Sequence, residues 1–143
     1  MEKANSELKK EISSSFVEQQ NVYLATANRD QPKVRPVTLI HAKNRLFVAT
    51  STNDAKVKQI VQNPKTEFCL LLEKGEAKGT LRAECMATIV KDTKIKSELH
   101  EKIPFMKEFW KTPSDPAYTL IEFQPSTFEY MKPGTMAAVK VKA

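Results

Sequence analysis

The residues between Thr50 and Lys56 combine hydroxyl groups and a lysine in a way that suits an anion. Thr50, Ser51 and Thr52 follow one another at the end of a β-prone run, and Lys56 comes four residues later in a short helix expected over 54–62. A helix start presents free N–H groups and the positive end of the helix dipole. The hydroxyl groups add further donors, so this pattern predicts a phosphate-binding turn.

A simpler interpretation of the same turn stays open. Thr52, Asn53 or Asp54 could serve only as the N-cap that any short helix favours. Asp54 also places a negative charge where the anion would lie. The spacing alone does not decide between a phosphate site and a helix cap.

A second candidate is the guanidinium of Arg35, which stands beside Pro36 in a strand-like run that continues through Val37 and Thr38. Arginine can grip a phosphate with two hydrogen bonds or stabilise negative charge that develops on a ring. Pro36 has no N–H to give to a neighbouring strand, so this part of the strand should have an edge, a bulge or a ligand beside it. The alternative is an ordinary surface arginine on an edge strand.

Other kinds of site have little support in the sequence. His41 and His100 are far apart and have no cysteine or carboxylate at ligand spacing, so no metal site is expected. The glycines cannot build a Rossmann or Walker phosphate loop, and no catalytic residue can be assigned. The net charge of +6 favours anionic ligands, but the basic residues lack interleaved aromatics, so no nucleic-acid partner is expected. Trp110 is either an aromatic lid over a ligand or core packing.

The elements that must position these residues are mostly short strands. Helices are expected over 6–19, 54–62, a segment capped by Asp92, and 105–111. Strands are expected over 22–27, 33–41, 46–50, 66–73, 80–90, 117–123 and 127–131. The strand over 66–73 is apolar on both faces, which predicts cover on each side. Residues 132–143 are expected to form a mobile tail.

These elements predict one mainly β domain over residues 1–143, with residues 1–19 as an N-terminal helical segment. Because the strands would otherwise leave exposed edges, a closed or split antiparallel β-barrel of six to seven strands with peripheral helices is the economical arrangement. The longest clean apolar run, residues 68–72, is too short to span a membrane. Cys69 and Cys85 are isolated and predict free thiols in a reducing compartment, so a cytoplasmic protein is expected.

The order of these features resembles one known family. The matching segments are residues 24–26, 32–37, 46–50, 56, 59–60 and 63–64, continuing to Trp110 and to residues 115–116 and 125–130. Together they are similar to the FMN-binding split-barrel family typified by pyridoxamine 5'-phosphate oxidase, and to its general stress protein branch. The resemblance covers about residues 15–131 and rests on the ordered set rather than on any single motif.

The resemblance implies a homodimer with FMN bound at the interface. Carried over by position, Arg35 with Pro36 would contact the flavin phosphate or ring edge, and Val37 and Thr38 would lie along the isoalloxazine. Thr50, Ser51 and Lys56 would hold the phosphate, and Trp110 is a further candidate contact.

Two departures from the family pattern bear on affinity and substrate. The oxidases carry an arginine and a lysine where this sequence has Ala55 and Ile40, so fewer charges should grip the phosphate. The longer oxidases also use a C-terminal segment for pyridoxal phosphate that this sequence lacks. Vitamin B6 oxidation is therefore not expected.

The leading functional hypothesis is an FMN-dependent oxidoreductase of unknown substrate, with NAD(P)H as a possible reductant and Arg35 as the charge that stabilises reduced flavin. The alternative is a flavin-binding, stress-related carrier or sensor without turnover. Deazaflavin or haem remain alternative cofactors, since both occur in the superfamily.

Overall fold

The structure is a computed structural model that describes residues 2–143, with side chains from residue 5 onward; Met1, the start of the predicted N-terminal segment, lies outside the described residues. Its elements, in chain order, are α1 (Glu2–Ser14), β1 (Gln19–Asn28), β2 (Gln31–Ala42), β3 (Arg45–Ser51), α2 (Ala55–Gln62), β4 (Lys65–Lys74), β5 (Ala77–Ile89), α3 (Thr93–Lys102), α4 (Met106–Phe109), β6 (Tyr118–Met131) and β7 (Val139–Lys142).

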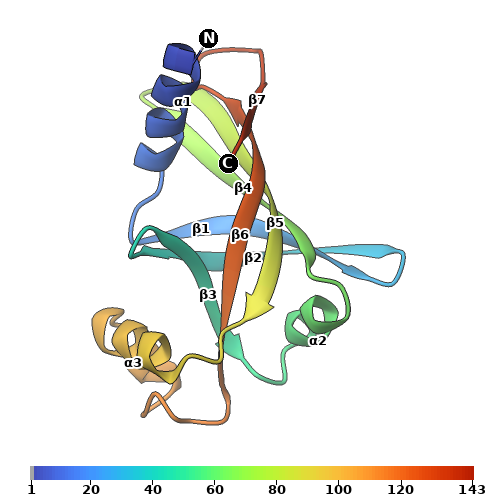
Figure 1. Cartoon of the computed structure of the whole chain (residues 1–143), viewed down its shortest axis with the longest axis vertical. Helices are drawn as coiled ribbons and strands as arrows, with labels where there is room; N and C mark the ends of the chain where they lie inside the picture. Colours follow the sequence, from blue (N-terminus) through green and yellow to red (C-terminus); the bar gives the residue numbers. More distant parts are fainter. Residues whose placement is uncertain (1) are drawn as a thin grey trace.

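The strands form a ring. They pair in the order β3-β2-β1-β4-β5-β6-β7, and β3 also pairs with β6, so β1 to β6 close on themselves while β7 extends the sheet outside the ring. Each of the strand pairs is antiparallel. The helices lie around the ring rather than within it (Figure 1). The predicted split antiparallel barrel with peripheral helices is confirmed.

The ring has two short seams. β2 pairs with β3 only from Ile40 to Ala42, and β1 pairs with β4 only from Tyr23 to Ala25. The turn between β2 and β3 is Lys43-Asn44, with positive φ at both residues, which matches the twist of a tight hairpin. Beyond Ile40 and Phe47 the two strands separate, and this separation creates the space for the site described below.

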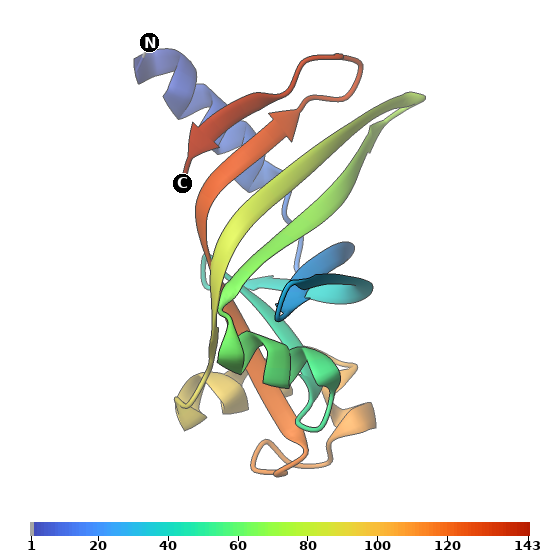
Figure 2. The ribbon, with the colours of Figure 1, turned by 90° about the vertical axis from the view of Figure 1, so that its right-hand side faces the viewer.

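Two apolar clusters stabilise the molecule. One fills the ring with buried side chains such as Leu24, Phe68 and Leu81. The other packs α3 and α4 against β3 and β6 through residues such as Leu99 and Met106. Figure 2 shows α1 and β7 at one end of the molecule and α2 and α3 at the other. Among the described residues, no helix has the length and apolar character needed to cross a bilayer.

The first helix ends five residues earlier than the predicted 6–19 range. The hydroxyl groups of Ser14 and Ser15 donate to the carbonyl of Glu11, and the chain then leaves the helix. Phe16 is therefore not on a helical face. Its ring instead packs near those of His41, Phe68 and Phe128 from the segment that follows the helix.

The C-terminal region also differs from prediction. The two strands expected over 117–123 and 127–131 are one continuous strand, β6, because the break at Pro125 is absorbed as a register shift opposite Glu84 and Cys85. The mobile-tail prediction is wrong for residues 139–142, which form β7 on the edge of β6 and bury Val141. Gly79 allows this return, because a Cβ there would lie 2.3 Å from the carbonyl oxygen of Met131.

The prediction that β4 is covered on both faces is wrong for the single chain. Phe68 and Leu70 are buried in the ring, but Leu71 on the opposite face is 57% exposed. Tyr23 and Val34, on the neighbouring strands, are also exposed. The register pairs Tyr23 with both Pro36 and Cys69, so one outer face of β1, β2 and β4 carries these apolar groups.

Candidate functional site

A cavity of about 460 Å³ opens where β2 and β3 separate. β2 supplies one wall with Pro36, Val37 and Thr38, and β3 supplies the other with residues 48–51. β2 is held in place by its full-length ladder with β1, and β3 by its ladder with β6. Because β1 holds β2 and β6 holds β3, the two strands that form the walls do not have to pair with each other along the cavity.

The base of the cavity is formed by the start of α2. Lys56 lines the cavity although the residue is only 7% exposed, and its Nζ donates to Thr50 Oγ1 at 2.8 Å. Asp54 is the N-cap of α2, because its side chain accepts from the backbone N–H of Lys56. Thr50 and Ser51 line the same cavity from the end of β3. A buried ammonium and hydroxyl groups at the start of a helix are groups that can bind an anion, and we refer to Thr50, Ser51 and Lys56 below as the cradle.

Arg35 lies beside this cradle but does not line the cavity. Its guanidinium donates to the backbone carbonyl of Leu24 at 3.1 Å and to Gln59 Oε1 at 2.8 Å, and Gln59 also accepts from the hydroxyl of Thr26. These bonds tie α2 to β1 and β2. Burial lowers the pKa of Arg35, which the nearby charge of Asp54 opposes.

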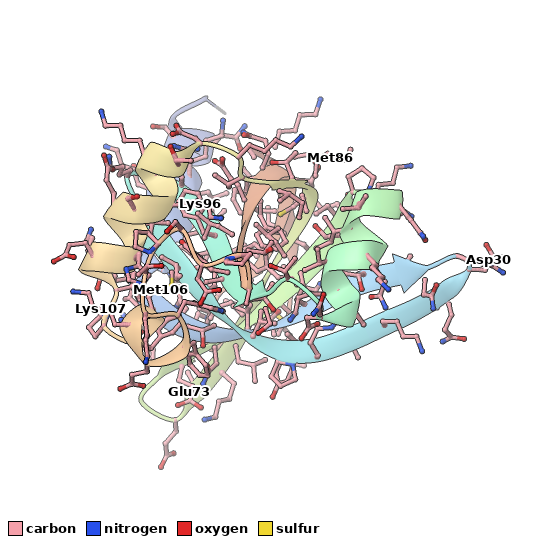
Figure 3. The ribbon with its side chains drawn as sticks, turned by 90° about the horizontal axis from the view of Figure 1, so that it is seen from below. Asp30, Glu73, Met86, Lys96, Met106 and Lys107 are labelled. Carbon is pink, nitrogen blue, oxygen red and sulfur yellow. The ribbon has the colours of Figure 1, made fainter. Side chains whose placement is uncertain are left out.

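The remaining wall is aromatic. Phe105, Phe109 and Trp110, from residues 105–110 around α4, also line the cavity. Trp110 stacks on Tyr118 with ring centroids 5.0 Å apart, and its backbone carbonyl accepts from the buried ring of His100 at 2.7 Å. Figure 3 shows the α4 turn, with Met106 and Lys107, on the side of the molecule away from the hairpin tip at Asp30.

Comparison with known families identifies the chain. The sequence profile described as pyridoxamine 5'-phosphate oxidase matches residues 8–132. The chain belongs to the pyridoxamine 5'-phosphate oxidase family. No curated protein matches the sequence.

Several solved structures share the fold of this chain. General Stress Protein 26 from Bacillus anthracis is 26% identical, with a TM-score of 0.74 over 95% of this chain and 98% of its own. A putative pyridoxamine 5'-phosphate oxidase from Listeria innocua is 19% identical, with a TM-score of 0.67 over 89% and 97%. The haem storage protein HutZ from Vibrio cholerae is 18% identical, with a TM-score of 0.60 over 82% and 87%.

Most of the site residues expected from the sequence come together in this oxidase-family chain. The structure brings seven of them to one cavity: Pro36, Val37, Thr38, Thr50, Ser51, Lys56 and Trp110. Arg35 is the exception, because its guanidinium is turned toward α2. Trp110 both packs in the core and lines the cavity, so its two interpretations are compatible.

Sequence reasoning missed four residues that line the cavity, Val48, Ala49, Phe105 and Phe109, and gave no role to the amide of Gln59. Phe105 and Phe109 line the cavity, and Gln59 links Arg35 to α2. The exposed side chain of Phe109 is the feature that points to a ligand contact, and only the structure reveals this exposure. Gln59 was part of the family resemblance without an assigned role, and only its hydrogen bonds reveal one.

Proposed function

We propose that this protein binds FMN in the cavity between β2 and β3 and acts as a flavin-dependent oxidoreductase. The observation that supports this best is the pairing, in one cavity, of a buried Lys56–Thr50 cradle with an aromatic wall. A phosphate ester suits the cradle, and a planar ring suits the aromatic wall. The cavity volume of about 460 Å³ also lies within the roughly 300–1,000 Å³ typical of small-molecule sites.

The residues of the chain would divide the work of holding the cofactor. Thr50, Ser51 and Lys56 would bind the phosphate, while Val37 and Thr38 would lie along the flavin ring. FMN would supply the electron-transfer chemistry, and the protein would supply position and charge. Arg35 would act through its charge and through its hold on Gln59, because its guanidinium does not line the cavity.

A homodimer completes this proposal. A second hollow of about 420 Å³ is lined by Tyr23 and Leu71 and shares Pro36, Val37 and Thr38 with the cofactor cavity. The exposed apolar face of β1, β2 and β4 therefore continues to the mouth of the cavity. A second copy of the chain seated there would bury Tyr23 and Leu71 and close the cofactor site. The two free cysteines fit a cytoplasmic location.

One observation favours the alternative of a flavin-binding carrier or sensor without turnover. Among the described residues that line the cavity, Lys56 is the only titratable side chain, so the lining offers no obvious general acid or base. Haem is less favoured than a flavin, because the described residues of the chain that line the cavity include no histidine, cysteine, methionine or tyrosine to ligate iron. Deazaflavin would use the same aromatic wall and stays an alternative.

The proposal is tested first by binding. The purified full chain is titrated with FMN and, separately, with haem, and the visible spectrum and native mass are recorded. We expect a flavin spectrum with one FMN per chain in a dimer. A Soret band from tightly bound haem, with no FMN binding, would contradict the assignment.

Turnover separates the two functional hypotheses. The FMN-loaded protein is mixed with NADH or NADPH without oxygen, and bleaching of the flavin is followed before an acceptor is added. Reduction followed by reoxidation supports the oxidoreductase. A flavin that binds but exchanges no electrons with either nucleotide supports the carrier or sensor.

A further inference from the structure

Asp54 is the residue on which the further inference depends. It caps α2 in an extended conformation, and its Oδ1 accepts from the backbone N–H of Lys56 at 3.1 Å. The same oxygen lies 3.0 Å from Lys56 Nζ, so this carboxylate both caps the helix and pairs with the ammonium that lines the cavity.

The charge of Lys56 is therefore already satisfied within the chain. Its ammonium contacts Asp54 Oδ1 on one side and Thr50 Oγ1 on the other, in a side chain that is only 8% exposed. A phosphate that approaches this ammonium meets a carboxylate at the same place. The phosphate and the carboxylate are both negatively charged and repel each other, and the repulsion is stronger where burial excludes water.

The surroundings keep Asp54 ionised. Burial raises the pKa of Asp54, but the hydrogen bonds and charge of Lys56, helped by the charge of Arg35, outweigh it and leave the pKa below its ordinary value. The Asp54 side chain is 42% exposed, in contrast to Lys56, so the carboxylate is in contact with solvent.

Resting on the proposed FMN site, we propose that Asp54 is a built-in anion that competes with the ligand's phosphate for Lys56. In this arrangement the phosphate adds less binding free energy than the lysine and hydroxyl groups would give it if the Asp54 carboxylate were absent. The chain should consequently prefer FMN to riboflavin, which carries the same ring without the phosphate, by a smaller factor than it would without the Asp54 carboxylate.

The test removes the charge and keeps the cap. Asp54→Asn is suitable because asparagine caps helices as well as aspartate does. Asp92→Asn is a matched control, because Asp92 caps α3 with the same kind of hydrogen bond, to the backbone N–H of Lys94 at 2.9 Å, whereas the carboxylate paired with Lys56 is that of Asp54. The dissociation constants of FMN and riboflavin are measured for the wild-type chain and both variants by quenching of flavin fluorescence.

We expect Asp54→Asn to bind FMN about tenfold more tightly, the order of magnitude for removal of one partly screened like charge. Its affinity for riboflavin should stay within about twofold, because riboflavin has no phosphate to repel. Asp92→Asn should change neither constant. Asp54→Ser, which also retains a capping hydroxyl, should reproduce the gain for FMN and guards against a fold defect specific to asparagine.

The outcomes separate this inference from the function on which it rests. If the wild-type chain binds FMN but Asp54→Asn and Asp54→Ser bind it no more tightly, Asp54 is only a helix cap and the inference is overturned. An equal gain for FMN and riboflavin would also overturn it, because the effect would then not involve the phosphate. If the wild-type chain and all variants bind neither flavin, the proposed function itself fails.

Discussion

Lys56 and Thr50 are the pair that should respond most sharply to substitution. Lys56→Ala removes the buried ammonium, and Thr50→Ala removes the hydroxyl that it contacts at 2.8 Å. We expect each substitution to weaken FMN binding by about 1.5 to 3 kcal/mol, the range for a hydrogen bond to a charged group. The measurement is the FMN dissociation constant.

Lys58→Ala is the control for Lys56→Ala, since Lys58 is an exposed lysine on the same helix that does not line the cavity. Its FMN affinity should equal that of the wild-type chain. The cradle is wrongly assigned if Lys56→Ala retains wild-type affinity, or if Lys58→Ala loses as much as Lys56→Ala does.

Phe109 gives a second test at the opposite wall. It lines the cavity and is 69% exposed, although its ring lies beside those of Phe105 and Trp110. We expect Phe109→Ala to weaken FMN and riboflavin binding equally, by about 0.5 to 1.5 kcal/mol, because the lost contact would be with the shared ring. Flavin titration of both ligands measures this.

The stability of the Phe109→Ala variant should change by less than about 0.5 kcal/mol, as expected for an exposed position. Val61→Ala, also exposed and outside the cavity lining, should affect neither property. A loss confined to FMN would mean that Phe109 does not contact the ring.

Among the elements, β7 is an edge strand in a polar, lysine-rich segment that the sequence did not predict as a strand. Its ladder with β6 buries Val141, whereas Val139 remains exposed. We expect Val141→Ala to lower the free energy of unfolding by about 1 to 2 kcal/mol, because it leaves a small cavity under β7. Urea unfolding of the purified chain measures the difference.

Val139→Ala is the paired control and should change stability by less than about 0.5 kcal/mol. Equal, negligible effects of the two substitutions would show that the strand is not docked on β6 in solution.

The short β2–β3 seam is the element-level feature that creates the site. Were β3 paired with β2 along its whole length, the space beside Val37 and Thr38 would be filled by a ladder. Instead β3 continues on β6 from Leu46 to Ser51, and β2 continues on β1. The gap between the two strands is thus a consequence of strand pairing, and the connection from β5 to β6 adds the aromatic wall of the cavity.

For the whole molecule, the exposed apolar face of β1, β2 and β4 offers a test of whether the protein forms the proposed dimer. Leu71→Arg places a charge in the centre of the proposed dimer contact, where burial without a partner is costly. We expect the native mass to fall to that of one chain and the FMN affinity to decrease with it, because the second copy would close the cavity mouth. Native mass spectrometry and flavin titration measure the two effects.

Met136→Arg is the corresponding control, because Met136 is almost fully exposed and does not line the hollow next to the cavity. It should leave the dimer and FMN binding intact. If the Leu71→Arg protein keeps the mass of a dimer, the dimer contact must lie on another surface.

Much of the fold was accessible from local patterns. The strand expected over 80–90, the helix expected over 54–62 and the Asp92 cap all depend on a few neighbouring residues, and the corresponding elements are present. The failures at Phe16, Pro125 and Val141 share a cause. Each depends on a partner far away in the chain: Phe68, the bulge opposite β5, and the edge of β6.

The sequence by itself determined the β-rich class, the cap at Asp54 and the residue types of the proposed anion cradle, because these are set by side-chain chemistry and short-range geometry. Only the tertiary structure decided that Arg35 turns to Gln59, that Phe109 faces the cavity, and that Asp54 neutralises Lys56. Those outcomes depend on directions that side chains take across separated strands. Packing sets such directions, and no spacing rule within one segment contains them.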